Sequence, residues 1–96
     1  MSLSFEWDPE KASANSRKHD VGFAEAISVF SDPLARIFAD EEHSGFEERE
    51  LIIGHSLKGT LLVVSFTEFM LGHIRVISAR RATRREVHDY QEQVTN

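Results

Sequence analysis

The central strand of the expected fold is residues 60–69, which read TLLVVSFTEF. Successive side chains of a strand point to opposite faces of the sheet, and in this segment both sets of alternating positions are apolar. One set contains Leu61 and Val63, and the other contains Leu62, Val64 and Phe66. A strand with two apolar faces is buried on both sides. This segment is therefore predicted to lie in the middle of a sheet that is covered on each face.

Further strands are predicted on both sides of this segment. Residues 49–55 precede it and residues 73–80 follow it, and a glycine-containing turn makes each connection. These three segments form an antiparallel meander. A weaker alternation over residues 34–40 and a short one over residues 3–7 predict two more strands.

Three helices are predicted. Residues 8–10, DPE, combine a capping carboxylate, a proline at the first helical position and an acid that the helix dipole favours, so a helix runs from there to about Lys18. A second helix covers residues 23–30, with an apolar stripe of Phe23, Ala26, Ile27 and Phe30. A third begins at a capping box of Thr83 and Glu86. The order β-α-α-β-β-β-β-α predicts an α+β fold, an antiparallel sheet with helices, as one domain over residues 1–96 with a core of about 3–92.

Composition limits the classes of function. The chain has 96 residues, a formal net charge of -5 and no cysteine, which excludes disulfides, thiolate metal sites and a cysteine nucleophile. The longest apolar run, residues 61–64, is too short to cross a bilayer, and the start of the chain lacks a secretory pattern, so we expect a cytoplasmic protein. Residues 40–50, here named the acidic loop, hold six acids and one arginine. The acidic loop is either a solvated turn or a docking surface for a basic partner.

Cationic charge is concentrated near the C-terminus. Residues 74–86 carry five arginines and no acid before Glu86. An RNA chain responds to this local field rather than to the net charge, which favours a phosphate-binding site at the corner between strand and helix. Arg81, Arg84 and Arg85 lie near a helix start, where cations are unfavourable unless an anion binds, so we assign them to RNA binding. The alternative is that they are solvated surface charges.

Five segments in this order resemble the BrnT family of bacterial type II toxins. They are FEWDPEKASANSRKH, VGFAEA, FSDP, ERELIIG and IRVISARRATRREVHDY, and together they extend from about Phe5 to Tyr90. The resemblance implies a RelE/ParE-like fold and a metal-independent ribonuclease that arrests translation. It also implies neutralisation by an antitoxin of the BrnA type, through which DNA would be bound only indirectly.

Metal-free RNA cleavage needs a base for the 2′-hydroxyl, cations for the phosphate and a proton for the leaving oxygen. The candidate catalytic residues are Lys18, His19, Arg49, Arg75 and Arg80. Arginine stays charged and suits charge stabilisation, whereas histidine is the better base. Lys18, beside the cation Arg17, is the alternative base. The resemblance assigns Lys18, His19 and Arg80 to the site. The alternative for Lys18 and His19 is that they only complement a helix dipole.

The spacing of the two strand arginines raises a geometric condition. Arg75 and Arg80 have opposite parity, so they share a site only if a bulge intervenes or Arg80 lies beyond the strand. On a regular strand, Arg75 would share its face with Ile77 and Ala79. Trp7 is interpreted as a core anchor, with stacking on an RNA base as the alternative.

The remaining histidines, at positions 43, 55, 73 and 88, show no metal-ligand spacing and are assigned no role, and no cofactor is expected. The competing function is a non-catalytic module that docks a small DNA-binding partner. The acidic net charge and the meagre cover expected from the third helix both favour this alternative.

Overall fold

The computed structural model describes residues 2–43, 45 and 47–95, and the predicted element order is confirmed. The strands are β1 (Ser4–Glu6), β2 (Arg36–Ala39), β3 (Glu50–His55), β4 (Leu61–Met70) and β5 (His73–Arg81). The helices are α1 (Pro9–His19), α2 (Phe23–Ser28) and α3 (Arg84–Thr95), with single 3-10 turns at Val29–Ser31 and Glu41–His43. Among the described residues, no helix is long and apolar enough to cross a membrane.

The five strands form one sheet in the order β1-β5-β4-β3-β2, with β4 in the middle as predicted. The four strands from β2 to β5 are antiparallel neighbours, whereas β1 pairs parallel to β5, from Ser4 opposite His73 to Glu6 opposite Arg75. The sheet is therefore mixed rather than wholly antiparallel. Because most of the chain separates β1 from β5, no hairpin turn forces them to run in opposite directions.

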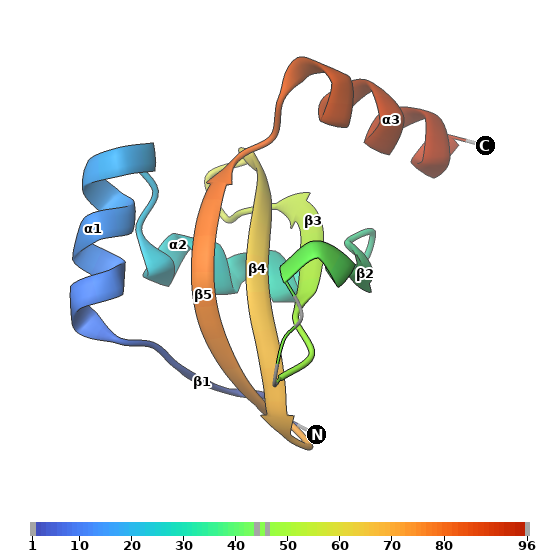
Figure 1. The fold of residues 1–96 in the computed structure, drawn as a ribbon. Coiled ribbons are helices and arrows are strands. Elements are labelled where there is room, and N and C mark those ends of the chain that lie inside the picture. The colour runs from blue at the N-terminus through green and yellow to red at the C-terminus, as the bar shows by residue number, and fades with distance from the viewer. Residues whose placement is uncertain (1, 44, 46, 96) are drawn as a thin grey trace.

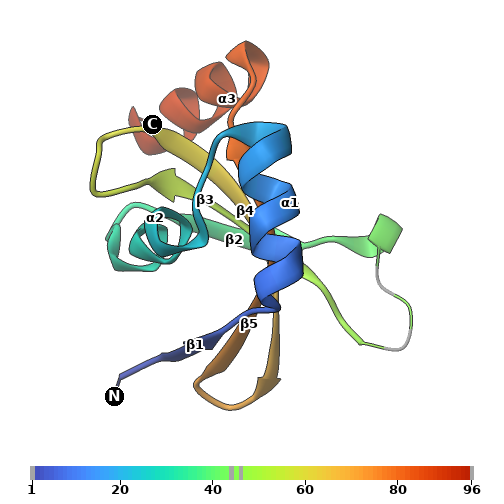
Figure 2. The same cartoon turned by 90° about the vertical axis from the view of Figure 1, so that its left-hand side faces the viewer.

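Helices α1 and α2 cover one face of the sheet (Figures 1 and 2). Between them and the sheet lies the main core, which contains Val21, Phe23, Ala26, Val29, Ile52, Leu62, Val64, Phe66, Ile74, Val76 and Ala79. Phe30 extends this core with an edge-on contact to Phe66, at 5.0 Å between ring centroids. Helix α2 ends at Ser28 rather than at Phe30, and the tighter 3-10 turn that follows buries Val29 completely, while Ile27 and Phe30 are only half-buried.

One buried polar side chain joins α1 to the sheet. The amide of Asn15 donates to the carbonyl oxygens of Ala79, at 2.8 Å, and Val21, at 3.1 Å. Its own oxygen accepts the backbone N–H of Ala79 at 3.1 Å. The pairing of β1 with β5 stops at Arg75, so Asn15 satisfies backbone groups on the edge of β5 that β1 leaves open.

Helix α3 covers one end of the opposite face (Figure 1). Its capping box forms as predicted, with the Thr83 N–H donating to Glu86 at 2.8 Å and the Glu86 N–H donating to the Thr83 hydroxyl at 3.2 Å. Tyr90 anchors the helix, because its ring is buried against Ile53, Leu61 and Val63. Its hydroxyl also donates to the Leu34 carbonyl at 3.2 Å. Residues 61–67 of β4 are all buried, so the predicted double cover of the central strand is confirmed.

Candidate active site

A bulge in β5 places two arginines on one face of the sheet. Ser65 of β4 pairs with Ser78, but the next residue, Phe66, pairs with Val76, so β5 has an extra residue between them. This insertion reverses the alternation of side chains beyond it. Arg75 and Arg80 therefore lie on the same face, opposite α1 and α2, which meets the geometric condition set by their parity. Ala79 is buried in the main core, so the expectation that it would share a face with Arg75 was wrong.

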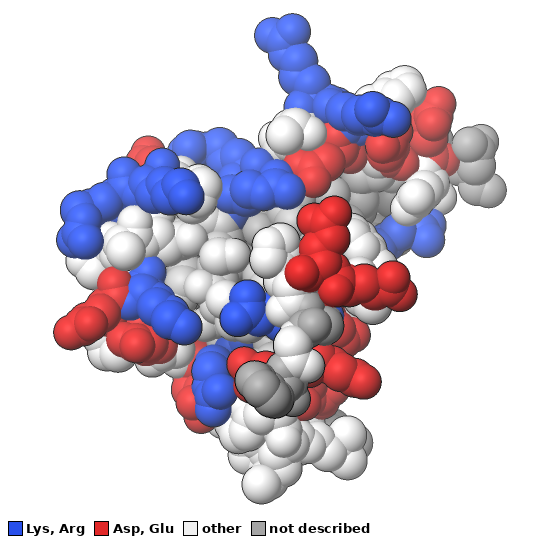
Figure 3. All heavy atoms as spheres, in the orientation of Figure 1, with Lys and Arg blue, Asp and Glu red and all other residues white. Residues whose placement is uncertain are grey.

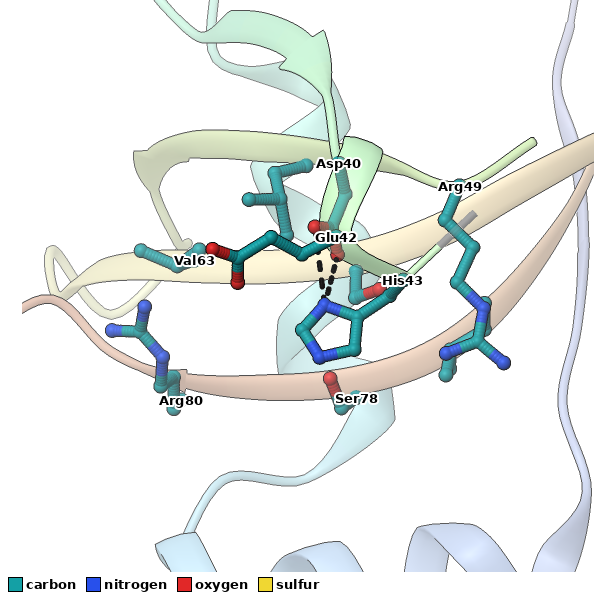
Figure 4. Close-up of a pocket in the computed structure, with 10 residues that line it drawn as sticks. Asp40, Glu42, His43, Arg49, Val63, Ser78 and Arg80 are labelled. Carbon is teal, nitrogen blue, oxygen red and sulfur yellow. Dashed lines mark hydrogen bonds and ion pairs between the residues drawn. The ribbon is translucent and has the colours of Figure 1, made fainter. Parts of the chain in front are cut away.

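A hollow of about 450 Å³ lies on this face, beside the acidic loop (Figure 4). It is here named the arginine pocket. Its lining residues are Asp40, Glu42, His43, Arg49, Leu51, Val63, Ser65, Ile77, Ser78 and Arg80. Arg49 lies immediately before β3 and Arg80 near the end of β5, and the two guanidinium groups flank the hollow. The fold thus brings two of the five predicted catalytic residues into one concave site.

A carboxylate fixes the orientation of Arg80. Its two terminal nitrogens donate to the two oxygens of Glu86 at 2.7 and 2.9 Å, a two-point contact that matches the planar guanidinium. These hydrogen bonds, opposed by partial burial and reinforced by the Thr83 N–H, lower the pKa of Glu86 from its ordinary 4.5 to about 2. The same contact raises the pKa of Arg80. Glu86 thus accepts a capping hydrogen bond at the start of α3 and also orients Arg80 in the pocket.

An imidazole that the sequence analysis left without a role also lines the pocket. The His43 Nδ1 lies 3.1 and 3.0 Å from the two carboxylate oxygens of Asp40. Figure 4 shows the ring between Arg49 and Arg80 and close to Ser78 of β5. The sequence carries no signal for this role, because Asp40 and His43 are three positions apart and become a pair only through the 3-10 turn at Glu41–His43.

Arg75 lies on the same face but outside the lining of the pocket. Its guanidinium contacts Glu6 at 3.2 Å and Glu47 at 3.7 Å, and it stacks on the Phe69 ring at 4.9 Å from the centroid. The side chain is therefore held between two carboxylates and an aromatic ring.

Lys18 and His19 end α1, on the helix-covered side of β5, and do not line the pocket. A contact nevertheless links this helix end to β5, because Arg81 donates to the His19 carbonyl at 3.4 Å and contacts the Asp20 carboxylate at 3.6 Å. Figure 3 shows cationic side chains gathered over the end of α1 and over the junction between β5 and α3. We name this surface, formed by Arg17, Lys18, Arg81, Arg84 and Arg85, the basic corner.

The other predicted RNA contacts differ in exposure. Arg84 and Arg85 are exposed in the first turn of α3. Trp7 is half-buried and packs edge-on against Phe23, with 6.0 Å between ring centroids, as expected of a core anchor. Within residues 2–43, 45 and 47–95, no group of three or more histidine or acidic side chains is arranged to hold a metal ion.

A mixed sheet that carries α1 and α2 on one face, and α3 beside an arginine pocket on the other, defines a small α+β protein with a site suited to binding a polyanion. The family model for the ribonuclease toxin BrnT of type II toxin–antitoxin systems matches residues 7–86. The chain therefore belongs to the BrnT family of ribonuclease toxins. No curated protein matched its sequence significantly.

A solved structure agrees with this assignment. The crystal structure of the Brucella abortus ribonuclease toxin BrnT, at 1.1 Å resolution, aligns with a TM-score of 0.65 and 25% identity. The alignment covers 86% of this chain and all of that one. The fold and the family predicted from the sequence are both confirmed.

Proposed function

We propose that this protein cleaves RNA in the arginine pocket without a metal ion and thereby inhibits translation. The observation that carries the proposal is the pair of guanidinium groups, Arg49 and Arg80, that flank one concave site. The Arg49 guanidinium, together with the N–H donors of Arg80 that do not contact Glu86, binds the non-bridging oxygens of a phosphodiester and stabilises the charge that accumulates there as a 2′-oxygen attacks phosphorus. Such charge stabilisation typically accounts for about 10²–10³ in rate for each donor.

The basic corner supports RNA binding next to the pocket. The cations of the basic corner are exposed, and His19 lies beside Arg81. We assign the basic corner and His19 to binding the RNA backbone, with Arg75 as a more distant contact on the pocket face. Trp7 packs in the core, and we propose that an RNA base stacks on the part of its ring that remains exposed.

We further propose that a BrnA-like antitoxin neutralises this chain in the cytoplasm, where translated RNA is found. A type II toxin acts only when its protein antitoxin is absent, and the acidic loop gives a basic segment of such a partner a complementary surface beside the pocket. Any DNA binding belongs to the antitoxin.

Cleavage of a purified RNA by the isolated protein tests the proposal. Wild type should cut in the presence of EDTA and leave 2′,3′-cyclic phosphate or 3′-phosphate ends, and Arg80→Ala should cut about 10²–10³-fold more slowly. Lys58→Ala is the matched control, because Lys58 is an exposed cation in the turn between β3 and β4. Loss of wild-type cleavage on chelation would contradict the metal-free mechanism. Folded wild-type protein that cuts no RNA would favour a binding module.

A further inference from the structure

The acidic loop carries one imidazole into the arginine pocket. The Asp40 N–H donates to the Arg49 carbonyl at 2.9 Å and closes the two ends of the loop against each other. The 3-10 turn at Glu41–His43 then folds back, with the His43 N–H donating to the Asp40 carbonyl at 3.3 Å. Local hydrogen bonds therefore hold His43 beside Arg49, although the two residues lie six positions apart.

The hydrogen bonds of His43 favour a ring that can accept a proton. The Asp40 side chain is only 12% exposed, and both of its oxygens lie within 3.1 Å of Nδ1. A carboxylate accepts hydrogen bonds, so in the neutral ring the hydrogen sits on Nδ1 and Nε2 keeps its lone pair. The His43 side chain is 62% exposed, which leaves Nε2 accessible to a bound substrate.

We propose that His43 is the general base of RNA cleavage and that Asp40 is its positioning residue. This inference rests on the proposed function. Nε2 takes the proton of the 2′-hydroxyl, the freed O2′ attacks the adjacent phosphorus, and the P–O5′ bond breaks as the O2′–P bond forms. Water donates a proton to the departing 5′-oxygen, and the hydroxide so formed takes the proton from the His43 imidazolium, which restores the neutral ring. The products are a 2′,3′-cyclic phosphate and a 5′-hydroxyl. Arg49 and Arg80 hold the phosphate during this step.

The position of His43 distinguishes it from the bases that the sequence favoured. His43 lines the hollow that contains both arginines, whereas Lys18 and His19 end a helix on the other face of the sheet. The charged groups that surround the imidazole in its two adjoining hollows are Asp40, Glu42, Glu47, Arg49 and Arg80. Because Arg49 and Arg80 lie on opposite sides of the ring (Figure 4), a phosphate bound in the pocket meets a cation on each side and the imidazole between them.

Single-turnover cleavage of a defined RNA, measured from pH 5 to 9, tests the assignment. His43→Ala should lower the rate by about 10²–10⁴-fold and remove the fall in rate at acidic pH that a base must cause. Added imidazole should restore part of the lost rate in His43→Ala and none in Arg80→Ala. Asp40→Asn should cause a smaller loss, because it weakens the alignment of the ring without removing it. His88→Ala, on exposed α3 surface, should retain the wild-type rate.

The outcomes separate this inference from the proposed function. If His43→Ala is folded and cuts at the wild-type rate while Arg80→Ala is impaired, His43 is not the base and the pocket remains the site. If His19→Ala or Lys18→Ala abolishes the acidic limb instead, the base lies at the end of α1. Wild-type protein that does not cut RNA at all would overturn both proposals.

Discussion

The two faces of the sheet differ in what fills them. The face under α1 and α2 holds a continuous apolar core, and its buried amide, Asn15, donates two hydrogen bonds and accepts one. The opposite face has a small apolar cluster beneath α3 and, next to it, a hollow lined by arginine, histidine and carboxylate groups. One sheet therefore keeps its stabilising contacts and its charged groups apart. Substitutions on the two faces should accordingly change different properties, stability on one and catalysis on the other.

The largest effect is expected in the main core. Phe66→Ala should lower the free energy of unfolding by about 3–5 kcal/mol, because it removes a fully buried ring and its contact with Phe30. Urea unfolding measures the change. Phe69→Ala, on the same strand but 43% exposed, is the control and should cost far less. Equal losses for both variants would contradict the division between the faces.

The next effect should appear on the pocket face, in activity alone. Arg49→Ala should reduce kcat/KM for RNA cleavage by about 10²-fold, because one of the two cations on the phosphate is lost. Arg49→Lys should recover part of this loss, since it restores the charge without the forked geometry. Thermal unfolding of both variants should stay close to wild type. A variant that loses stability and activity together would show that Arg49 also supports the fold.

A smaller effect is expected at the junction of α1 with β5. Asn15→Ala should destabilise the protein by about 1–3 kcal/mol, because both backbone groups of Ala79 lose their buried partner. Ser13→Ala, on the exposed side of the same helix, should change stability by about 0.5 kcal/mol or less. Hydrogen exchange at the Ala79 amide should accelerate in Asn15→Ala. Unchanged protection there would show that another group shields this edge of β5.

The smallest effect is expected in how the free energy of unfolding changes with acid, through Glu86. Because folding lowers the pKa of this carboxyl from 4.5 to about 2, its contribution is fully present above pH 4.5 and is lost as pH falls from 4.5 towards 2. The side chain is one-third exposed, so we discount this contribution to about 1 kcal/mol. Unfolding of wild type and Glu86→Gln, compared at pH 7 and pH 3, measures it. The difference between the two proteins should shrink at the lower pH; a constant difference would contradict the linkage.

Much of the fold could be predicted because its signals are local. The doubly apolar β4, the proline-capped α1 and the capping box of α3 each depend on residues close together in the chain. The parallel pairing of β1 was not predicted, since it joins residues about 69 positions apart. The early end of α2 was also missed, because the tertiary contacts that bury Val29 select the tighter turn.

The site was only partly predictable. Arg49 and Arg80 were both predicted candidates, and the pocket contains both. His43 was missed because its partner Asp40 lies in a loop whose acidity looked like simple solvation. The roles of Lys18, His19 and Arg75 remain predictions, and the substitutions above are designed to rank them against His43.

Sequence alone determined the order of the elements, the central strand, the family and the presence of excess cationic charge near the C-terminus. These follow from side-chain periodicity, capping chemistry and motif spacing, which the linear chain carries in full. Only the tertiary structure decided which charged side chains lie together in the arginine pocket. The β5 bulge reverses side-chain alternation within one residue, and the closed acidic loop carries an imidazole to the arginines. The first depends on the register between two strands and the second on backbone hydrogen bonds that close a loop, and residue identity specifies neither.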